Sequence, residues 1–163
     1  SYDTGHKVLP FELIPDAMAL MYSIGEFDKA NYYSQQLQAN LNDLDDFTKQ
    51  MIEYVKNQNQ STVVQVKTLN KNGITSFSKG RFSDAIQFFE EALSYAPMHT
   101  TVALNFAQTI LSLIDLEPHN KSQLLDQCRH VFRVVSGISL MDAYDKRAKS
   151  LKKRMDEIEL DIS

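Results

Sequence analysis

The sequence predicts an all-α fold made of antiparallel helix pairs. Apolar residues recur at spacings of three and four, most clearly at Phe82, Ile86, Phe89 and Leu93, which share one face of a helix. Only 5 glycines and 4 prolines occur in 163 residues, which is low for a loop-rich or all-β chain. The β-prone run at 62–66 leads directly into a helical pattern, so we assign it to the start of a helix.

The same spacing, together with capping residues, predicts eight helices in order along the chain. Pro15 suits the first turn of the first helix, where its missing N–H costs no hydrogen bond. Ser61 and Ser139 can cap the helices that follow them. Asp84 is an acidic residue of the kind that stabilises the first turn of a helix, and Pro97 ends the helix before it. The predicted ranges are 15–24, 27–40, 43–58, 62–79, 82–95, 99–116, 120–136 and 139–161.

Gly25 and Gly80 begin two copies of a short motif that lie 55 residues apart. Each glycine is followed two residues later by Phe and five residues later by Ala. We expect a tight turn at each glycine, because glycine adopts turn conformations without steric cost. Helical hairpin repeats of one common type have a period of about 34 residues. The two copies lie farther apart than this period, and the additional residues leave room for one extra helix, at 43–58.

Small and aromatic residues follow a regular order between Leu69 and Pro97. Gly73 lies in the first helix of this segment, Gly80 in its turn and Ala85 in its second helix. In this spacing the segment resembles a tetratricopeptide repeat, a helix pair in which residues without bulk lie where the two helices approach most closely. Two flanking copies are more divergent. The resemblance implies structural roles for Gly25, Ala30, Gly73, Gly80, Ala85, Phe89, Ala92, Pro97 and Ala107.

The resemblance implies an α-solenoid, in which helix pairs stack on one another. We expect a single domain over residues 1–163, and the missing initiator Met indicates a fragment of a larger protein. The predicted parts are repeat-like pairs at about 14–40, 67–97 and 100–136, an extra helix at 43–58 and a C-terminal helix at 139–161.

In tetratricopeptide proteins the first helix of each pair lines a groove that binds peptides or helices. The chain lacks the complete set of basic residues that chaperone-binding members use, so we do not expect it to bind chaperone tails. A second interpretation is that additional helices of the protein itself fill this groove. In register with the family, the candidate groove residues are Lys67, Asn70, Lys71, Ile74, Phe77, Thr101, Leu104, Asn105 and Gln108.

The last predicted helix carries an apolar seam on one side and a basic block on another. The seam is either a cap on the end of the solenoid or a contact between two copies of the chain. The basic block is either a solvated face balanced by nearby acids or a nucleic-acid patch. A net charge of −4 argues against bulk attraction to nucleic acid, so we favour the solvated face. The seam comprises Leu140, Tyr144, Leu151, Met155 and Ile158, and the block comprises Lys146, Arg147, Lys149, Lys152, Lys153 and Arg154.

Nothing in the sequence combines an acid, a base and a nucleophile. Cys128 lies on an apolar helical stripe without an activating base, which favours a buried structural cysteine. The four histidines have no metal-ligand spacing with a carboxylate, and no phosphate-binding loop or nucleophile elbow occurs. We therefore expect neither an enzyme nor a bound metal or cofactor.

A longer run, from Asn70 through Pro97 to Gln108 and into a basic helix, resembles the carboxy-terminal repeat region of certain bacterial response regulators. This resemblance implies the partner-binding or output part of a two-component signalling protein. The predicted function is protein–protein interaction with a protein or peptide partner. The alternatives are oligomerisation or nucleic-acid binding through the last helix. No signal peptide or apolar membrane span is evident, so we expect a cytoplasmic location and no membrane partner.

Overall fold

The computed structural model describes residues 13–38, 45–136 and 142–161, and their regular structure is helical throughout. The all-α prediction is confirmed. The helices are α1 (Ile14–Ser23), α2 (Phe27–Gln38), α3 (Asp46–Ser78), α4 (Phe82–Tyr95), α5 (Thr100–Leu116), the short 3-10 helix η3 (Pro118–Asn120), α6 (Lys121–Ser136) and α7 (Asp142–Leu160). Among the described residues, none of these helices combines the length and the apolar character needed to cross a bilayer.

The helices predicted at 43–58 and 62–79 form one continuous helix, α3, so the separation between them was wrong. The intervening residues contain neither glycine nor proline, and Ser61 lies in the middle of the helix rather than at a cap. Asn59 donates a hydrogen bond to the carbonyl of Val55, one turn earlier, at 2.8 Å. Polar side chains that bond back in this way are accommodated within a helix, and a serine alone does not end one. The real cap is Asp45, whose carboxylate accepts the Thr48 N–H at 2.7 Å.

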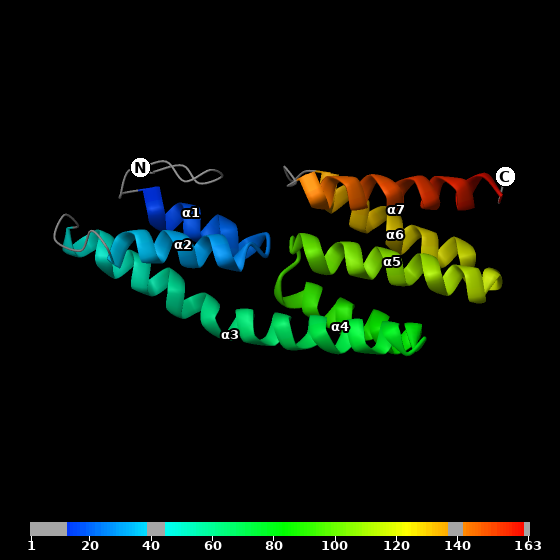
Figure 1. Ribbon diagram of the computed structural model, residues 1–163, viewed down its shortest axis with the longest axis horizontal. Coiled ribbons are helices and arrows are strands. Elements are labelled where there is room, and N and C mark those ends of the chain that lie inside the picture. Colours follow the sequence, from blue (N-terminus) through cyan, green and yellow to red (C-terminus); the bar gives the residue numbers. More distant parts are fainter. Residues whose placement is uncertain (1–12, 39–44, 137–141, 162–163) are drawn as a thin grey trace. The chain divides into compact units, whose positions relative to one another are not determined.

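The contacts between helices gather the chain into two compact units, residues 1–64 and 65–163, whereas we expected one domain. In the first unit α1 and α2 pack side by side (Figure 1). Gly25 forms the turn between them with φ 85°, and the rings of Tyr22 and Phe27 meet across it at 6.3 Å. Met18 and Ala30 are fully buried between the two helices. The turn predicted at Gly25 is therefore confirmed.

The second unit contains the C-terminal part of α3 and all of α4 to α7. Helix α4 packs on α5, α5 packs on α6, and α7 lies against both α5 and α6 (Figure 1). Helices that follow one another in the chain run antiparallel, so α5 and α7 point the same way (Figure 1). Helix α5 is the central element of this unit, since it packs against α4, α6 and α7. Its fully buried side chains form the middle of the core: Val102, Leu104, Ala107, Thr109, Ile110 and Leu111.

The corner between α3 and α4 follows the predicted pattern of small and aromatic residues. Gly80 forms the turn with φ 74°. Gly73 lies beneath the ring of Phe89, so closely that a Cβ built on Gly73 would stand 2.4 Å from Phe89 Cε1. The rings of Phe77 and Phe82 meet on either side of the turn at 5.1 Å. Of the residues assigned a structural role, Ala30, Gly73, Ala85, Phe89, Ala92 and Ala107 are buried, and Pro97 is exposed just beyond the end of α4.

Candidate functional site

The polar residues predicted to line a groove on α3 and α5 are bonded to one another and to α7. Asn105 on α5 donates to Asn70 Oδ1 on α3 at 2.8 Å. Arg147 on α7 donates to Asn105 Oδ1 and to Gln108 Oε1, both at 2.7 Å. One arginine thus holds two side chains of the expected groove. The contacts support the second interpretation made from the sequence, in which a helix of the protein itself occupies this face.

The other predicted groove residues divide into three groups. Leu104 is fully buried in the core, so its assignment to the groove was wrong. Helix α5 has neighbours on several sides, and the repeat register alone did not distinguish its core-facing positions from its groove-facing positions. Phe77 is half-buried against Phe82, and Thr101 is half-buried. Lys67, Lys71 and Ile74 are exposed. A cavity of about 210 Å³ remains here, lined by Ile74, Phe77, Phe89, Asn105, Gln108 and Thr109.

Replacing Asn105 with alanine is expected to destabilise the fold by about 1–2 kcal/mol, because it removes two cross-helix hydrogen bonds, one of them to a charged group. Urea denaturation measures this loss. Thr101→Ala is the matched control, since Thr101 is also half-buried on α5. A loss no larger than that of the control would show that the bonds of Asn105 do not stabilise the packing of α3, α5 and α7.

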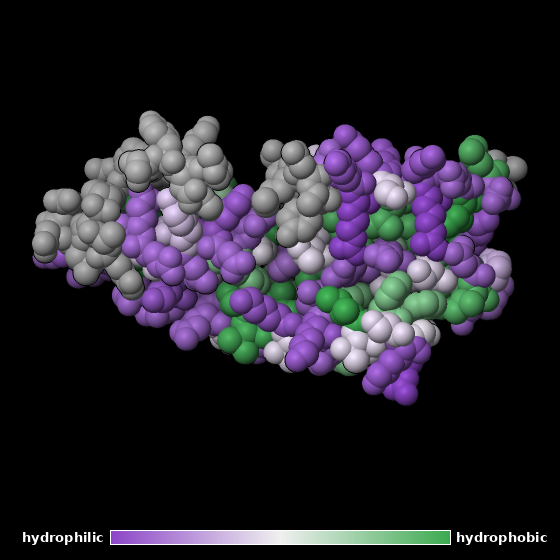
Figure 2. All heavy atoms as spheres, viewed as in Figure 1, coloured by the Kyte–Doolittle hydropathy of each residue, from purple (hydrophilic) through white to green (hydrophobic). Residues whose placement is uncertain are grey.

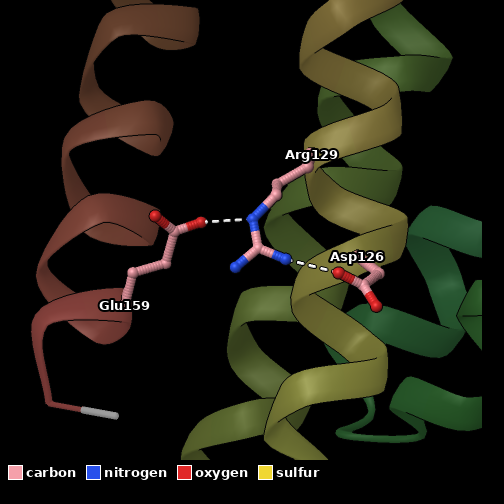
Figure 3. A network of polar contacts seen from close by, with 3 residues as sticks. All are labelled: Asp126, Arg129 and Glu159. Atoms are coloured by element: carbon pink, nitrogen blue, oxygen red, sulfur yellow. Dashed lines mark hydrogen bonds and ion pairs between the residues drawn. The ribbon is translucent and has the colours of Figure 1, made fainter. Parts of the chain in front are cut away.

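Helix α7 uses its apolar seam within the chain. Leu151 and Met155 are buried, and Ile158 is half-exposed. Leu140 and the side chain of Tyr144 lie outside the described residues. An ion-pair network strengthens the contact with α6: Arg129 Nε donates to Glu159 Oε1 at 2.6 Å, and the same guanidinium contacts Asp126 (Figure 3). The buried members of the seam are therefore covered within the chain and are not open to a second chain.

About half of the basic block of α7 also acts within the chain. Arg154 pairs with Asp115, Lys149 pairs with Asp145 at 2.8 Å, and Arg147 holds the side chains described above. Lys146, Lys152 and Lys153 are exposed. On the face shown in Figure 2, hydrophilic side chains gather along α7. The block is therefore partly a set of cross-helix contacts, and only part of it is a free basic surface.

A groove on the other side of α5 is mainly apolar. This α4–α6 groove has a volume of about 500 Å³. Gln127 also lines it, and its Oε1 is buried without a hydrogen-bond partner among the described residues. A mainly apolar groove fits a ligand that brings apolar side chains. The other lining residues are Glu90, Leu93, Pro97, Ala103, Phe106, Asp126, His130, Val131 and Val134.

A larger groove, of about 930 Å³, lies between α6 and α7. Its apolar residues are each less than a tenth exposed and form a narrow floor: Phe132, Val135, Ala148 and Met155. Charged residues dominate its rim: Asp126, Arg129, Arg133, Asp145, Lys149 and Lys152. We call this the α6–α7 groove.

The remaining chemical candidates are buried. Cys128 is fully buried, and burial raises the pKa of its thiol to about 12, which keeps the sulfur protonated. His99 is buried at the start of α5, where its Nδ1 accepts the Val102 N–H at 3.3 Å. Within the described ranges, no three His, Cys, Asp or Glu side chains gather closely enough to hold a metal ion.

Sequence reasoning missed both grooves because it considered only the first helix of each pair. One signal was present: Gln127 interrupts the apolar stripe of α6 next to Cys128, with Leu124 and Val131 one turn away on either side. The role of Arg147 was also missed. It appeared only as one of six basic residues, because the partners of a long side chain on another helix cannot be read from helical spacing.

No family model, no curated protein and no solved structure matches this chain.

Proposed function

We propose that this chain is a protein-interaction module built from tetratricopeptide-like helix pairs, and that it binds a segment of a partner protein in the α4–α6 groove. The positive φ of Gly80 and the close contact of Gly73 with Phe89 support the repeat-like pairing of α3 with α4. Helices α5 and α6 continue the stack, and α7 covers its end.

The observation that carries the proposal is the chemistry of the α4–α6 groove. Leu93 and Val134 are half-exposed in its walls, and Phe106 lies below them. Apolar side chains of a partner would remove this surface from water, which is the main driving force for association.

The two alternative functions receive less support. Oligomerisation through the seam needs an open apolar face, yet Leu151 and Met155 are buried within the chain. Nucleic-acid binding through α7 is less favoured because Arg147 and Arg154 are held by residues of α5, which leaves only part of the basic block free. The place of the chain in a bacterial two-component system and its cytoplasmic location stay predictions from the sequence.

Affinity capture from a nuclease-treated bacterial lysate tests the proposal, with the parent chain and two double variants as bait. Leu93→Glu with Val134→Glu places two carboxylates in the groove at half-exposed positions, so the fold is expected to survive. Gln87→Glu with Gln123→Glu adds the same charge at exposed positions of α4 and α6 that do not line the groove. Circular dichroism checks all three proteins.

We expect the same proteins to be retained by the parent and by the control, and to be lost from the groove variant. Hydrogen exchange of the parent with a recovered partner should show protection in α4 and α6. Equal retention by all three baits, or no retention above the bare resin, would contradict the proposal.

Gln127→Leu is expected to raise the free energy of unfolding by about 1 kcal/mol. The buried Oε1 has no partner among the described residues, and its removal stabilises the protein because this group no longer loses its hydration on folding. Thermal melts of the parent and the variant measure the effect. Gln123→Leu, on the exposed side of α6, is the control and should change stability little. A fall in stability for Gln127→Leu would mean that Oε1 is paired in solution.

A further inference from the structure

The rim of the α6–α7 groove carries two cations for which the described residues supply no ion pair. Of its two acids, Asp126 pairs with Arg129 and Asp145 pairs with Lys149. Arg133 and Lys152 are exposed on opposite helices of the same groove and have no ion pair among the described residues. Two cations therefore remain above the apolar floor.

A groove between two packed helices suits a third helix. Its two walls are the packed helices α6 and α7, and its floor is a narrow apolar row that includes Phe132 and Met155. A third helix fits between two packed helices when one of its apolar ridges enters the groove between them. The other helices of this unit pack in the same manner, since α5 lies among α4, α6 and α7.

We propose that the α6–α7 groove binds an amphipathic helix of a partner protein, with acidic residues beside its apolar row. The apolar row would cover the floor, and carboxylates on either side would reach Arg133 and Lys152. An arginine guanidinium suits a carboxylate because it donates two parallel hydrogen bonds. The rim acids and the apolar floor disfavour a nucleic acid, whose phosphates would lie near Asp126 and Asp145.

This inference does not rest on binding in the α4–α6 groove. Asp126 is the one residue that lines both grooves, and the Leu93 and Val134 changes leave Arg133 and Lys152 in place. Failure at one groove can therefore be told apart from failure at the other.

The test uses the full chain and four labelled probes, with binding followed by fluorescence anisotropy at low and physiological salt. The first probe is a designed helical peptide with leucines at i, i+3, i+4 and i+7 and glutamates on both sides of them. The second carries lysines in place of the glutamates, the third carries serines in place of the leucines, and the fourth is a single-stranded DNA oligonucleotide. We expect the glutamate peptide to bind about tenfold more tightly than any other probe at low salt, with a smaller advantage at physiological salt.

Two charge-reversal variants locate the site. Arg133→Glu with Lys152→Glu should abolish the preference for the glutamate peptide over the lysine peptide. Lys146→Glu with Lys153→Glu makes the same change in net charge at exposed positions of α7 that do not line the groove, and should keep most of the preference.

Three results would overturn the inference. Equal binding of the glutamate and lysine peptides would show that the groove does not select its ligand by charge. Equal loss in both charge-reversal variants would indicate a general charge effect rather than this groove. Tighter binding of the oligonucleotide than of the glutamate peptide would make α7 a nucleic-acid surface instead.

Discussion

Replacing Gly73 with alanine is expected to lower the free energy of unfolding by about 1–3 kcal/mol. The added Cβ would stand 2.4 Å from Phe89 Cε1, closer than carbon atoms approach without displacement. Phe89 is 1% exposed, so its ring must shift within the core, and the cavity of about 210 Å³ that it lines can take up part of that shift. Alanine favours a helix by about 1 kcal/mol over glycine, and this gain offsets only part of the strain. Urea denaturation of the parent and the variant measures the difference.

Two further variants separate the steric cause from a backbone cause. Combining Gly73→Ala with Phe89→Leu should give a smaller loss than the sum of the two single changes, because the smaller side chain leaves room for the methyl group. Gly80→Ala acts differently: nothing lies within 4 Å of the added Cβ, but φ is 74°. It should cost about 1–2 kcal/mol through the backbone, and Phe89→Leu should not rescue it. A rise in stability for Gly73→Ala would show that α3 and α4 are less closely packed than described.

Stability is expected to fall by about 3 kcal/mol between pH 6.5 and pH 4 because of His99. Burial lowers the pKa of His99 from 6.5 to about 4 in the folded protein. Above pH 6.5 the imidazole is neutral in both states, so its contribution to stability is fully present. Below pH 6.5 the unfolded chain takes up a proton that the folded chain does not, and the difference grows until the folded pKa is reached. Nδ1 must also stay unprotonated to accept the Val102 N–H.

His99→Asn is the matched variant for this pH dependence. Asparagine is a strong N-cap residue, so its side-chain oxygen can accept the same N–H, and it does not titrate. Carboxylates also protonate near pH 4, but they do so in both proteins. The difference in unfolding free energy between parent and variant therefore isolates His99. The inference about His99 fails if the two proteins lose the same stability between pH 7 and pH 4.

The sequence alone was enough to predict which faces of the helices are buried and where the chain turns. Phe89 and Ala92 on α4 are buried as their spacing indicated, and Gly25 and Gly80 adopt positive φ at the predicted turns. These features depend on residues a few positions apart on one helix or at one turn. Helical periodicity and the missing glycine side chain are local properties, so they can be read directly from the order of residues.

The continuity of α3 was harder to predict, because the run from Gln58 to Thr62 is polar and carries no strong signal in either direction. Polar residues without glycine or proline permit a helix as readily as they permit a linker. The side-chain bond from Gln58 Nε2 to Tyr54 Oη, at 2.7 Å, is one local contact made by the helix. A serine was interpreted as a cap because caps favour serine, but serine also occurs inside helices.

The order of residues was enough to predict an all-α chain with small residues at close helix contacts and a core on the apolar stripes. The contact of Arg147 on α7 with Asn105 and Gln108 on α5, on the face first expected to bind a partner, became visible only in the folded chain. Folding also leaves apolar grooves on both sides of α6. The physical reason is that a helical pattern states which residues face inward, whereas the choice of neighbouring helix depends on side chains far apart in the chain that meet only after folding.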